Sequence, residues 1–244
     1  MATLMIQKLA DSCVRVDIGD HSALIDPGFY TWEHDGLDLA SMPAPDRLLI
    51  THNHPDHLSI EFVEALVAAY PSMVIETNEE VAANLADAGI EAATASAEWT
   101  AQFTAPHEPI PIGSQPHNVG FVVGGVFAHP GDSYSFDATP PALALPFLAP
   151  WGSTTEAVTL AKRLKPRYVV PIHDWYLEER GKRWLYGMAE RAGFTAWQSG
   201  RSPRKGSPCS RSMTSRPSAS KSAEEPSRRG RPGNDSGVIL VIAP

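Results

Sequence analysis

The chain has 244 residues, of which 43% are hydrophobic and 20% charged, so it can bury the core of one soluble globular domain or of two small ones. Two cysteines exclude a disulfide framework, no stretch is long enough to span a bilayer, and the first residues lack a signal-peptide pattern, so we expect a cytoplasmic protein. The net charge is −8 and the first 200 residues alone carry −14, which disfavours a nucleic-acid partner for that part of the chain.

The first hundred residues predict strands that give way to alternating strands and helices. Short apolar runs bounded by turn residues predict strands at 4–9, 13–18, 23–25, 48–50 and 73–76. Apolar residues recur at helical spacing over 62–70, and Pro71 follows this predicted helix directly. Thr77 and Glu80 have the spacing of a capping box and predict a helix that runs to Ala88.

The second half repeats this alternation after a hairpin. Further strands are predicted at 99–104, 119–123, 126–129, 143–145 and 168–172. Ser153 and Glu156 form a second capping box for a helix that ends before Pro166, and a last helix is predicted at 182–192. This order predicts an α/β protein of the α+β type, with two packed sheets between helical layers.

A dense cluster of metal-binding residue types follows the strand at 48–50. Residues 51–57 read Thr-His-Asn-His-Pro-Asp-His. Side chains alternate along an extended chain, so His52 and His54 project from the same side and could hold one divalent metal. Asp56 and His57 come where the chain turns and could hold a second. Imidazole nitrogen and carboxylate oxygen suit zinc, which is therefore the first expectation.

The other candidate ligands also lie at predicted strand ends. His107 follows the strand at 99–104, Asp132 follows the hairpin, and His173 ends the strand at 168–172. His117 is an alternative to His107. Asp26 precedes a Pro-Gly pair and is expected to be a structural turn residue rather than a ligand. The remaining histidines, His21, His34 and His129, are not expected to be ligands, although His129 could lie close enough to support the site.

Together these motifs resemble the metallo-β-lactamase-fold hydrolase superfamily, and most closely its branch of ascorbate-6-phosphate lactonase-like, zinc-dependent hydrolases. The resemblance covers roughly residues 4–195. It is carried by an ordered series of segments: Leu-Ile-Asp-Pro-Gly at 24–28, the run at 51–57, His107, Gly-Asp-Ser at 131–133 and Pro-Ile-His at 171–173. The family pattern usually has Thr where Ser133 stands, which keeps the hydroxyl. The fold that this resemblance implies is a four-layer αββα sandwich.

The resemblance also implies a role for each candidate ligand. One zinc would be bound by His52, His54 and His107, a second by Asp56, His57 and His173, and Asp132 would bridge the two. A hydroxide shared by the metals would be the nucleophile. Asp56 would also orient the hydroxide or handle its proton, and Asp56 and His173 are therefore the expected catalytic residues. Mn²⁺ and Fe²⁺ are alternatives to Zn²⁺, and a mononuclear site is an alternative to a dinuclear one.

The expected function is hydrolysis of an ester, lactone, amide or phosphodiester bond in a small molecule, with no membrane partner; the sequence does not give the oligomeric state. A loop is expected at 29–32, and its aromatic residues, like Trp175 and Tyr176 after His173, are candidates to contact substrate. Two alternatives stay open. One is a nuclease of the same fold that its basic tail tethers to nucleic acid, and the other is a non-catalytic relative that serves as an interaction module.

The chain after residue 198 has a different composition. Residues 199–235 are rich in Ser, Arg, Pro and Gly, and from residue 201 onward nine Lys and Arg face three Asp and Glu. Such a segment lacks the apolar surface that would offset its ordering entropy. We therefore expect a hydrolase domain over 1–198 and a basic, disordered tail over 199–244, which ends in a short apolar patch at 238–242 and is dispensable for activity.

Overall fold

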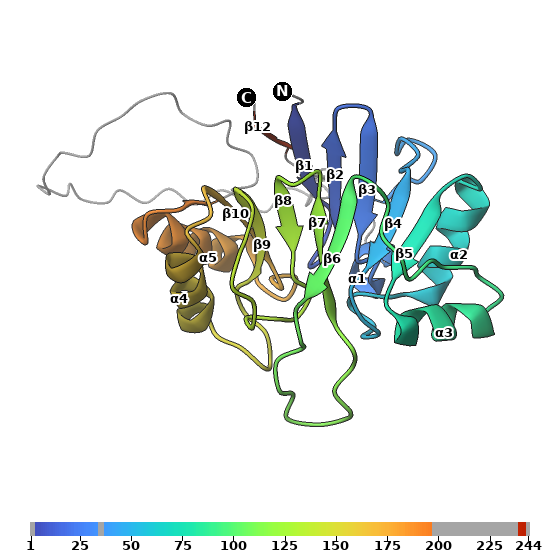
Figure 1. Cartoon of the computed structure of the whole chain (residues 1–244). Coiled ribbons are helices and arrows are strands. Elements are labelled where there is room, and N and C mark those ends of the chain that lie inside the picture. Colours follow the sequence, from blue (N-terminus) through green and yellow to red (C-terminus); the bar gives the residue numbers. More distant parts are fainter. Residues whose placement is uncertain (1–2, 34–36, 197–238, 243–244) are drawn as a thin grey trace, which may run out of the picture.

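The computed structural model describes residues 3–33, 37–196 and 239–242, which form two six-stranded sheets packed face to face (Figure 1). The first sheet has the order β12 (Ile239–Ile242), β1 (Leu4–Lys8), β2 (Val14–Ile18), β3 (His21–Ile25), β4 (Arg47–Ile50) and β5 (Val74–Thr77). The second has the order β11 (Thr195–Ala196), β10 (Tyr168–Ile172), β9 (Ala142–Pro146), β8 (Phe127–His129), β7 (Val119–Val123) and β6 (Thr100–Thr104).

Helices cover the outer face of each sheet (Figure 1). The first sheet packs against α2 (Ile60–Ala69) and α3 (Glu79–Asp87), and the second against α4 (Thr154–Leu164) and α5 (Glu179–Arg191). A short helix, α1 (Phe29–Trp32), follows β3 where the sequence predicted only a loop. The four-layer αββα sandwich is therefore confirmed. No helix in the three described ranges is long and apolar enough to cross a membrane.

Strand periodicity explains why the layers form. In β3, Ala23 and Ile25 face the core between the sheets, whereas Leu24 faces the helices. Leu49 of β4 points inward in the same way, and its neighbours Leu48 and Ile50 point outward. These strands are apolar on both faces because both faces are covered, as expected for buried parallel strands. Strands β3, β4 and β5 run parallel, so their C-terminal ends meet at one edge of the sheet.

Of the two helix caps that the sequence predicted, one is confirmed and the other is wrong. Ser153 caps α4 as predicted, because its Oγ accepts the backbone N–H of Glu156. The capping box predicted at Thr77 is wrong. Asn78 caps α3 through a bond from the N–H of Val81, while the Thr77 hydroxyl donates to the carbonyl of Ile50 at 2.7 Å. Thr77 ends a buried strand, so its hydroxyl is used to join β5 to β4.

Residues 239–242, in the apolar patch at the end of the predicted tail, form a strand. β12 pairs antiparallel with β1, with Leu4 opposite Ile242 and Gln7 opposite Ile239. The backbone of β1 would otherwise form an open sheet edge, and such edges favour pairing with further strands. Residues 197–238, which hold most of the predicted tail, lie outside the described residues. The domain boundary at 198 and the disorder of this segment stay predictions.

Candidate metal centre

The predicted ligands converge at one edge of the sandwich, where strands of both sheets end. β4 delivers the 51–57 loop, and β10 delivers His173 from the other sheet. The ligand loop is fixed by Asp26, whose Oδ1 accepts the backbone N–H of Thr51 at 2.8 Å. Gly28 lies against the same loop, because a Cβ placed on it would lie 1.8 Å from the carbonyl oxygen of Asp56. Only glycine leaves room for this close approach.

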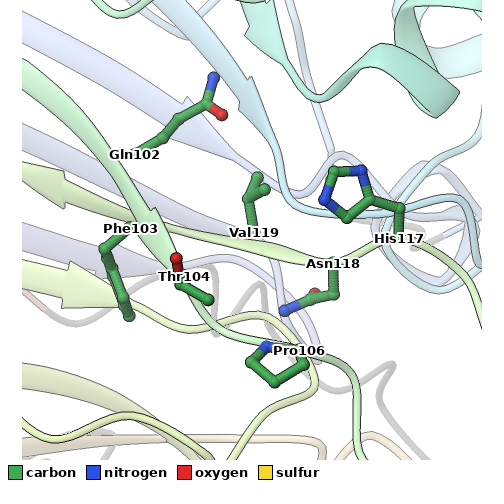
Figure 2. A pocket seen from close by; sticks show the side chains of 7 residues that line it. All are labelled: Gln102, Phe103, Thr104, Pro106, His117, Asn118 and Val119. Carbon is green, nitrogen blue, oxygen red and sulfur yellow. The ribbon is translucent and has the colours of Figure 1, made fainter.

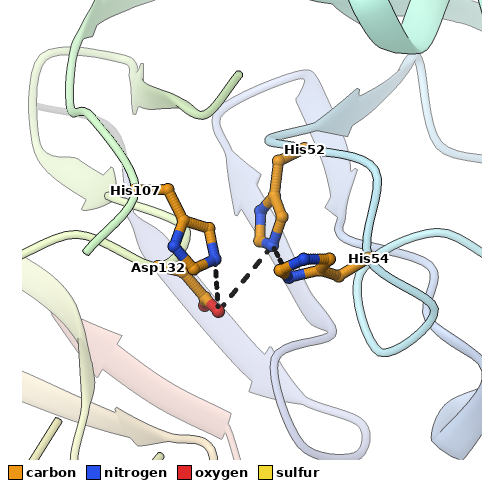
Figure 3. Close-up of side chains that lie close together, drawn as sticks. All are labelled: His52, His54, His107 and Asp132. Carbon is orange, nitrogen blue, oxygen red and sulfur yellow. Dashed lines mark hydrogen bonds and ion pairs between the residues drawn. The ribbon is translucent and has the colours of Figure 1, made fainter. Parts of the chain in front are cut away.

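A first set of ligand atoms comes from His52, His54, His107 and Asp132, all within 4.8 Å of one another (Figure 3). His52 Nε2 lies 3.1 Å from His54 Nδ1, and His107 Nε2 lies 3.3 Å from Asp132 Oδ2. The Nδ1–H of His107 donates to the carbonyl of Glu108 at 2.6 Å, which leaves the lone pair of Nε2 facing the set. This Nε2 is buried without a hydrogen-bond partner. A buried nitrogen of this kind is costly unless a ligand engages it, so the set fits a bound cation.

A second set comes from Asp56, His57 and His173. His57 Nε2 lies 3.1 Å from His173 Nε2 and 3.8 Å from Asp56 Oδ2. Asp132 connects the two sets: its Oδ1 is 2.7 Å from His173 Nε2 and 3.0 Å from His57 Nε2, while its Oδ2 faces the first set. One carboxylate therefore presents an oxygen to each set, which is the geometry expected of a bridging residue.

The alternative ligand His117 lies elsewhere. With Gln102, Phe103 and Asn118, it lines a cavity of 330 Å³ beside β6 and β7, whose lining includes none of the predicted ligands (Figure 2). Its own side chain is absent from both groups that could hold a metal among the described residues. Of the two alternatives, the structure places His107 in the centre.

Asp26 and His129 support the centre without entering either ligand set. The Nδ1–H of His57 donates to Asp26 Oδ2 at 2.7 Å, which directs Nε2 toward the site. A carboxylate that holds the far nitrogen of a ligand histidine is a recurring feature of metal sites. His129 accepts the N–H of Gly131 through Nδ1 and contacts the Ser12 carbonyl through Nε2. It thus shapes the turn that presents Asp132.

The loop after β10 is held by residues that the sequence analysis missed. His173 has a positive φ of 59°, an uncommon conformation for a non-glycine residue, and the backbone after it is tied down at two points. Asp11 Oδ1 accepts the N–H groups of Asp174 and Trp175. The buried Asp174 carboxylate in turn accepts from Lys8 Nζ and from the Tyr186 hydroxyl. These partners lie on β1 and α5, far apart in sequence, so no local pattern could have indicated them.

Trp151 is a further residue that the sequence analysis missed. Its indole Nε1–H donates to Asp132 Oδ2 at 2.8 Å. The ring also lies edge-on to the imidazoles of His107 and His173, with 5.8 Å between ring centroids in each case. A single Trp in the loop before Ser153 carries no sequence signal of such a contact.

The protonation of the centre differs between the two sets. Burial lowers the pKa of His52 well below its ordinary value, and it also lowers the pKa of His54, so both offer neutral nitrogens. Burial would lower the pKa of His57 and His173 too, but attraction to Asp132 outweighs it. The pKa of His57 lies well above the ordinary value, and that of His173 rises to about 9. Burial would raise the pKa of Asp132, but the surrounding imidazoles, His173 first, hold it well below its usual range.

Four aromatic residues border the second ligand set, and we call them the aromatic rim: Phe29, Tyr30, Trp175 and Tyr176. The rings of Tyr30 and Trp175 are stacked, with 3.7 Å between centroids. The N–H of Phe29 donates to the carbonyl of Pro55, next to Asp56. Trp175 and Tyr176 are each 44% exposed, so the rim offers aromatic surface to solvent beside the centre.

Comparison with known proteins gives the family. Residues 5–173 match the model of the beta-lactamase superfamily domain, and the chain belongs to this family. It is 25% identical over 210 residues to the protein Rv0786c of Mycobacterium tuberculosis, an alignment that covers 80% of this chain and 95% of that protein.

Solved structures show the same fold at low identity. Igni18, a metallo hydrolase from the archaeon Ignicoccus hospitalis, is 18% identical with a TM-score of 0.62, over 80% of this chain and 94% of that one. The isothiocyanate hydrolase from Delia radicum gut bacteria is 15% identical with a TM-score of 0.56, over 80% and 96%. Together with the sheets and helices described above, these likenesses establish the metallo-β-lactamase sandwich.

Proposed function

We propose that this protein is a metal-dependent hydrolase with a dinuclear centre. The observation that carries the proposal is the pair of ligand sets joined by Asp132, whose two oxygens face one set each. His52, His54 and His107 would hold one cation, and Asp56, His57 and His173 would hold the other. When bound, divalent cations supply an activated water at neutral pH and stabilise negative charge that develops on the substrate.

The ligands' own environment assigns further roles. Asp56 is the most accessible member of the second set, with 27% of its side chain exposed, whereas His57 and His173 are buried. Its carboxylate can therefore reach both the centre and an incoming substrate. We propose that Asp56 orients the attacking water and accepts its proton. His173 keeps Asp132 in place through the 2.7 Å contact, so its catalytic role is to hold the centre together.

Zinc is the proposed native metal. The ligands are five imidazoles and two carboxylates, a donor set that suits zinc, with Mn²⁺ and Fe²⁺ as alternatives. Elemental analysis of protein expressed with each metal in the medium distinguishes them. Protein that carries no metal after expression with zinc would contradict the proposal that this is a metal-dependent hydrolase.

The proposed substrate is a small molecule with an ester, lactone, amide or phosphodiester bond. The charge of −14 over the first 200 residues favours a small molecule over a nucleic acid. The assignment to the ascorbate-6-phosphate lactonase-like branch rests on the motif series and stays a proposal. A nuclease tethered by the basic residues after 200 is the second candidate. It predicts salt-sensitive DNA or RNA binding that disappears when residues 201–236 are deleted.

Substitution of one ligand tests the proposed function. His54→Ala removes an imidazole of the first set that is only half-buried, so the fold should survive. We expect hydrolysis of bis-p-nitrophenyl phosphate to fall by more than about 100-fold, since partners outside the ligand set alone are worth 10–100-fold. His117→Ala is the matched control, because the described hydrogen bonds of His117 involve only its backbone, and it should keep full activity. Activity retained by His54→Ala with an unchanged metal content would overturn the assigned site.

A further inference from the structure

The bridging carboxylate has one hydrogen-bond donor that is not itself a candidate ligand. Among the described residues, the side chains within contact distance of the Asp132 oxygens are four imidazoles and the indole of Trp151. Each of the four imidazoles belongs to a ligand set. The indole Nε1–H is thus the contact that remains a pure hydrogen bond when the imidazoles bind a cation.

The hydrogen bond acts on the oxygen that faces the first set. Asp132 Oδ2 lies 2.8 Å from Trp151 Nε1, 3.3 Å from His107 Nε2 and 3.7 Å from His52 Nε2. A carboxylate turns readily about its terminal torsion, and this rotation would take Oδ2 away from the first set. The indole donor fixes the rotation at the angle at which Oδ1 still meets His173. The orientation of the Asp132 carboxylate is therefore fixed by a contact at each of its two oxygens.

The indole is itself held in place by packing. Its ring lies 5.1 Å from that of Tyr134, whose hydroxyl donates to the carbonyl of Pro146 at 2.8 Å. Gly152 keeps the turn close to Tyr134, because a Cβ there would lie 2.8 Å from the tyrosine ring. Indole N–H is a donor only and does not titrate in the physiological range, so the contact to Asp132 is the same at every working pH.

We propose that Trp151 is a positioning residue that keeps Asp132 in its bridging orientation and so sets the affinity of the centre for its two cations. This inference rests on the proposed function, because it needs a centre that binds two metals. Partners that orient metal ligands are typically worth 10–100-fold in metal affinity. Loss of the N–H should weaken at least one of the two binding steps by that factor, while the three imidazoles of the first set stay in place.

Trp151→Phe tests the inference by keeping an aromatic ring and removing the donor. Zinc stoichiometry and affinity are measured by competition with a chelator, and the absorption spectrum of the cobalt(II)-loaded protein reports the ligand geometry. We expect one zinc to bind about 10–100-fold more weakly and the cobalt spectrum to change. Trp184→Phe on α5, where the side chain is 65% exposed, is the control and should match the wild type in both measurements.

A second variant covers loss of packing. Benzothienylalanine has the shape of tryptophan with sulfur in place of the N–H, and site-specific incorporation at residue 151 should weaken zinc binding like Trp151→Phe. If both variants bind two zincs with wild-type affinity, the inference is overturned and the proposed function stands. If the wild type itself binds no metal, the proposed function fails and this inference fails with it.

Discussion

A histidine is a useful metal ligand only if its free nitrogen faces the metal, and two contacts settle this for His57 and His107. Asp26 takes the Nδ1–H of His57, and the carbonyl of Glu108 takes the Nδ1–H of His107. In both residues Nε2 is left to face the centre. The orientation of the ligands is therefore determined by groups that would look like ordinary turn residues in the sequence.

The raised pKa values of His57 and His173 lead to a testable prediction about protons. At about pH 7 the imidazole of His173 is positively charged beside Asp132, because its pKa is raised to about 9, and the same carboxylate raises the pKa of His57. A metal binds only the deprotonated imidazole, so zinc added to chelator-treated protein should release protons at about pH 7 and fewer above about pH 9. Calorimetry in buffers of different ionisation enthalpy measures the number released.

The same shifts fix the direction of stability in the chelator-treated protein. A group whose pKa is raised on folding stabilises the fold below its unfolded pKa, here about 6.5, and this contribution is lost as the pH rises through about 9. The chelator-treated protein should therefore lose stability over this range, and zinc should restore it. For proton release, the same number of protons released by zinc at about pH 7 and above about pH 9 would contradict the assignment of His57 and His173 as ligands with raised pKa values.

At the scale of elements, α1 and the loop after β10 bring the aromatic rim beside the second ligand set. Phe29 and Tyr30 come from α1, and Trp175 follows His173 by two residues. Ligand sites are lined mainly by apolar and aromatic side chains around a few polar groups, and Trp175 and Tyr176 are each 44% exposed beside such polar groups. We therefore propose that the rim receives an apolar or aromatic group of the substrate.

Trp175→Ala tests the rim by comparing substrates. For esters with an aromatic group, kcat/KM should fall by roughly tenfold, since the lost contact is worth about 1.4 kcal/mol for a partly exposed ring. For small aliphatic esters, kcat/KM should change little, because they do not reach the rim. Trp184→Ala, the same change at an exposed position of α5, should leave both values unchanged. An equal loss for both kinds of ester would assign Trp175 a structural role instead.

The sequence predicted most elements because their signals are local. Strand periodicity, the Ser153 cap and the position of ligands at strand ends each depend on a few neighbouring residues. The predictions failed where a distant partner decides. The Thr77 hydroxyl donates to the carbonyl of Ile50 on the neighbouring strand β4. Trp151 has its role only because the fold brings it to Asp132. Supports such as Lys8 and Tyr186 have no local signal for the same reason.

At the scale of the whole molecule, the two ends of the described chain lie side by side in the first sheet (Figure 1). β12 covers the edge of β1 along four residue pairs, so Ile239–Ile242 belong to the sheet rather than to a free tail. The metal centre lies where β4 and β10 end. Lys8, at the end of β1, contacts the Asp174 carboxylate next to His173. The edge that β12 protects is thus connected to the site through one strand.

Removal of β12 tests this arrangement. A chain that stops after residue 238 should unfold with a free energy lower by about 2 kcal/mol or more, since each backbone hydrogen bond contributes about 1 kcal/mol net. It should also self-associate through the uncovered edge of β1. A chain that stops after Ile242 is the matched control and should behave as the full chain. Urea unfolding and light scattering measure the two effects, and equal stability of both truncations would show that β12 does not support the sheet.

The pairing of β1 with β12 also bears on how the protein folds. Leu4 and Ile242 come from opposite ends of the sequence, so their contact closes the longest loop in the described structure and carries the largest entropic cost. Every other strand of the first sheet is available long before β12 emerges from the ribosome. During synthesis the β1 edge is therefore unpaired while the rest of the sandwich assembles, and this interval is when the chain is most exposed to pairing with a neighbour.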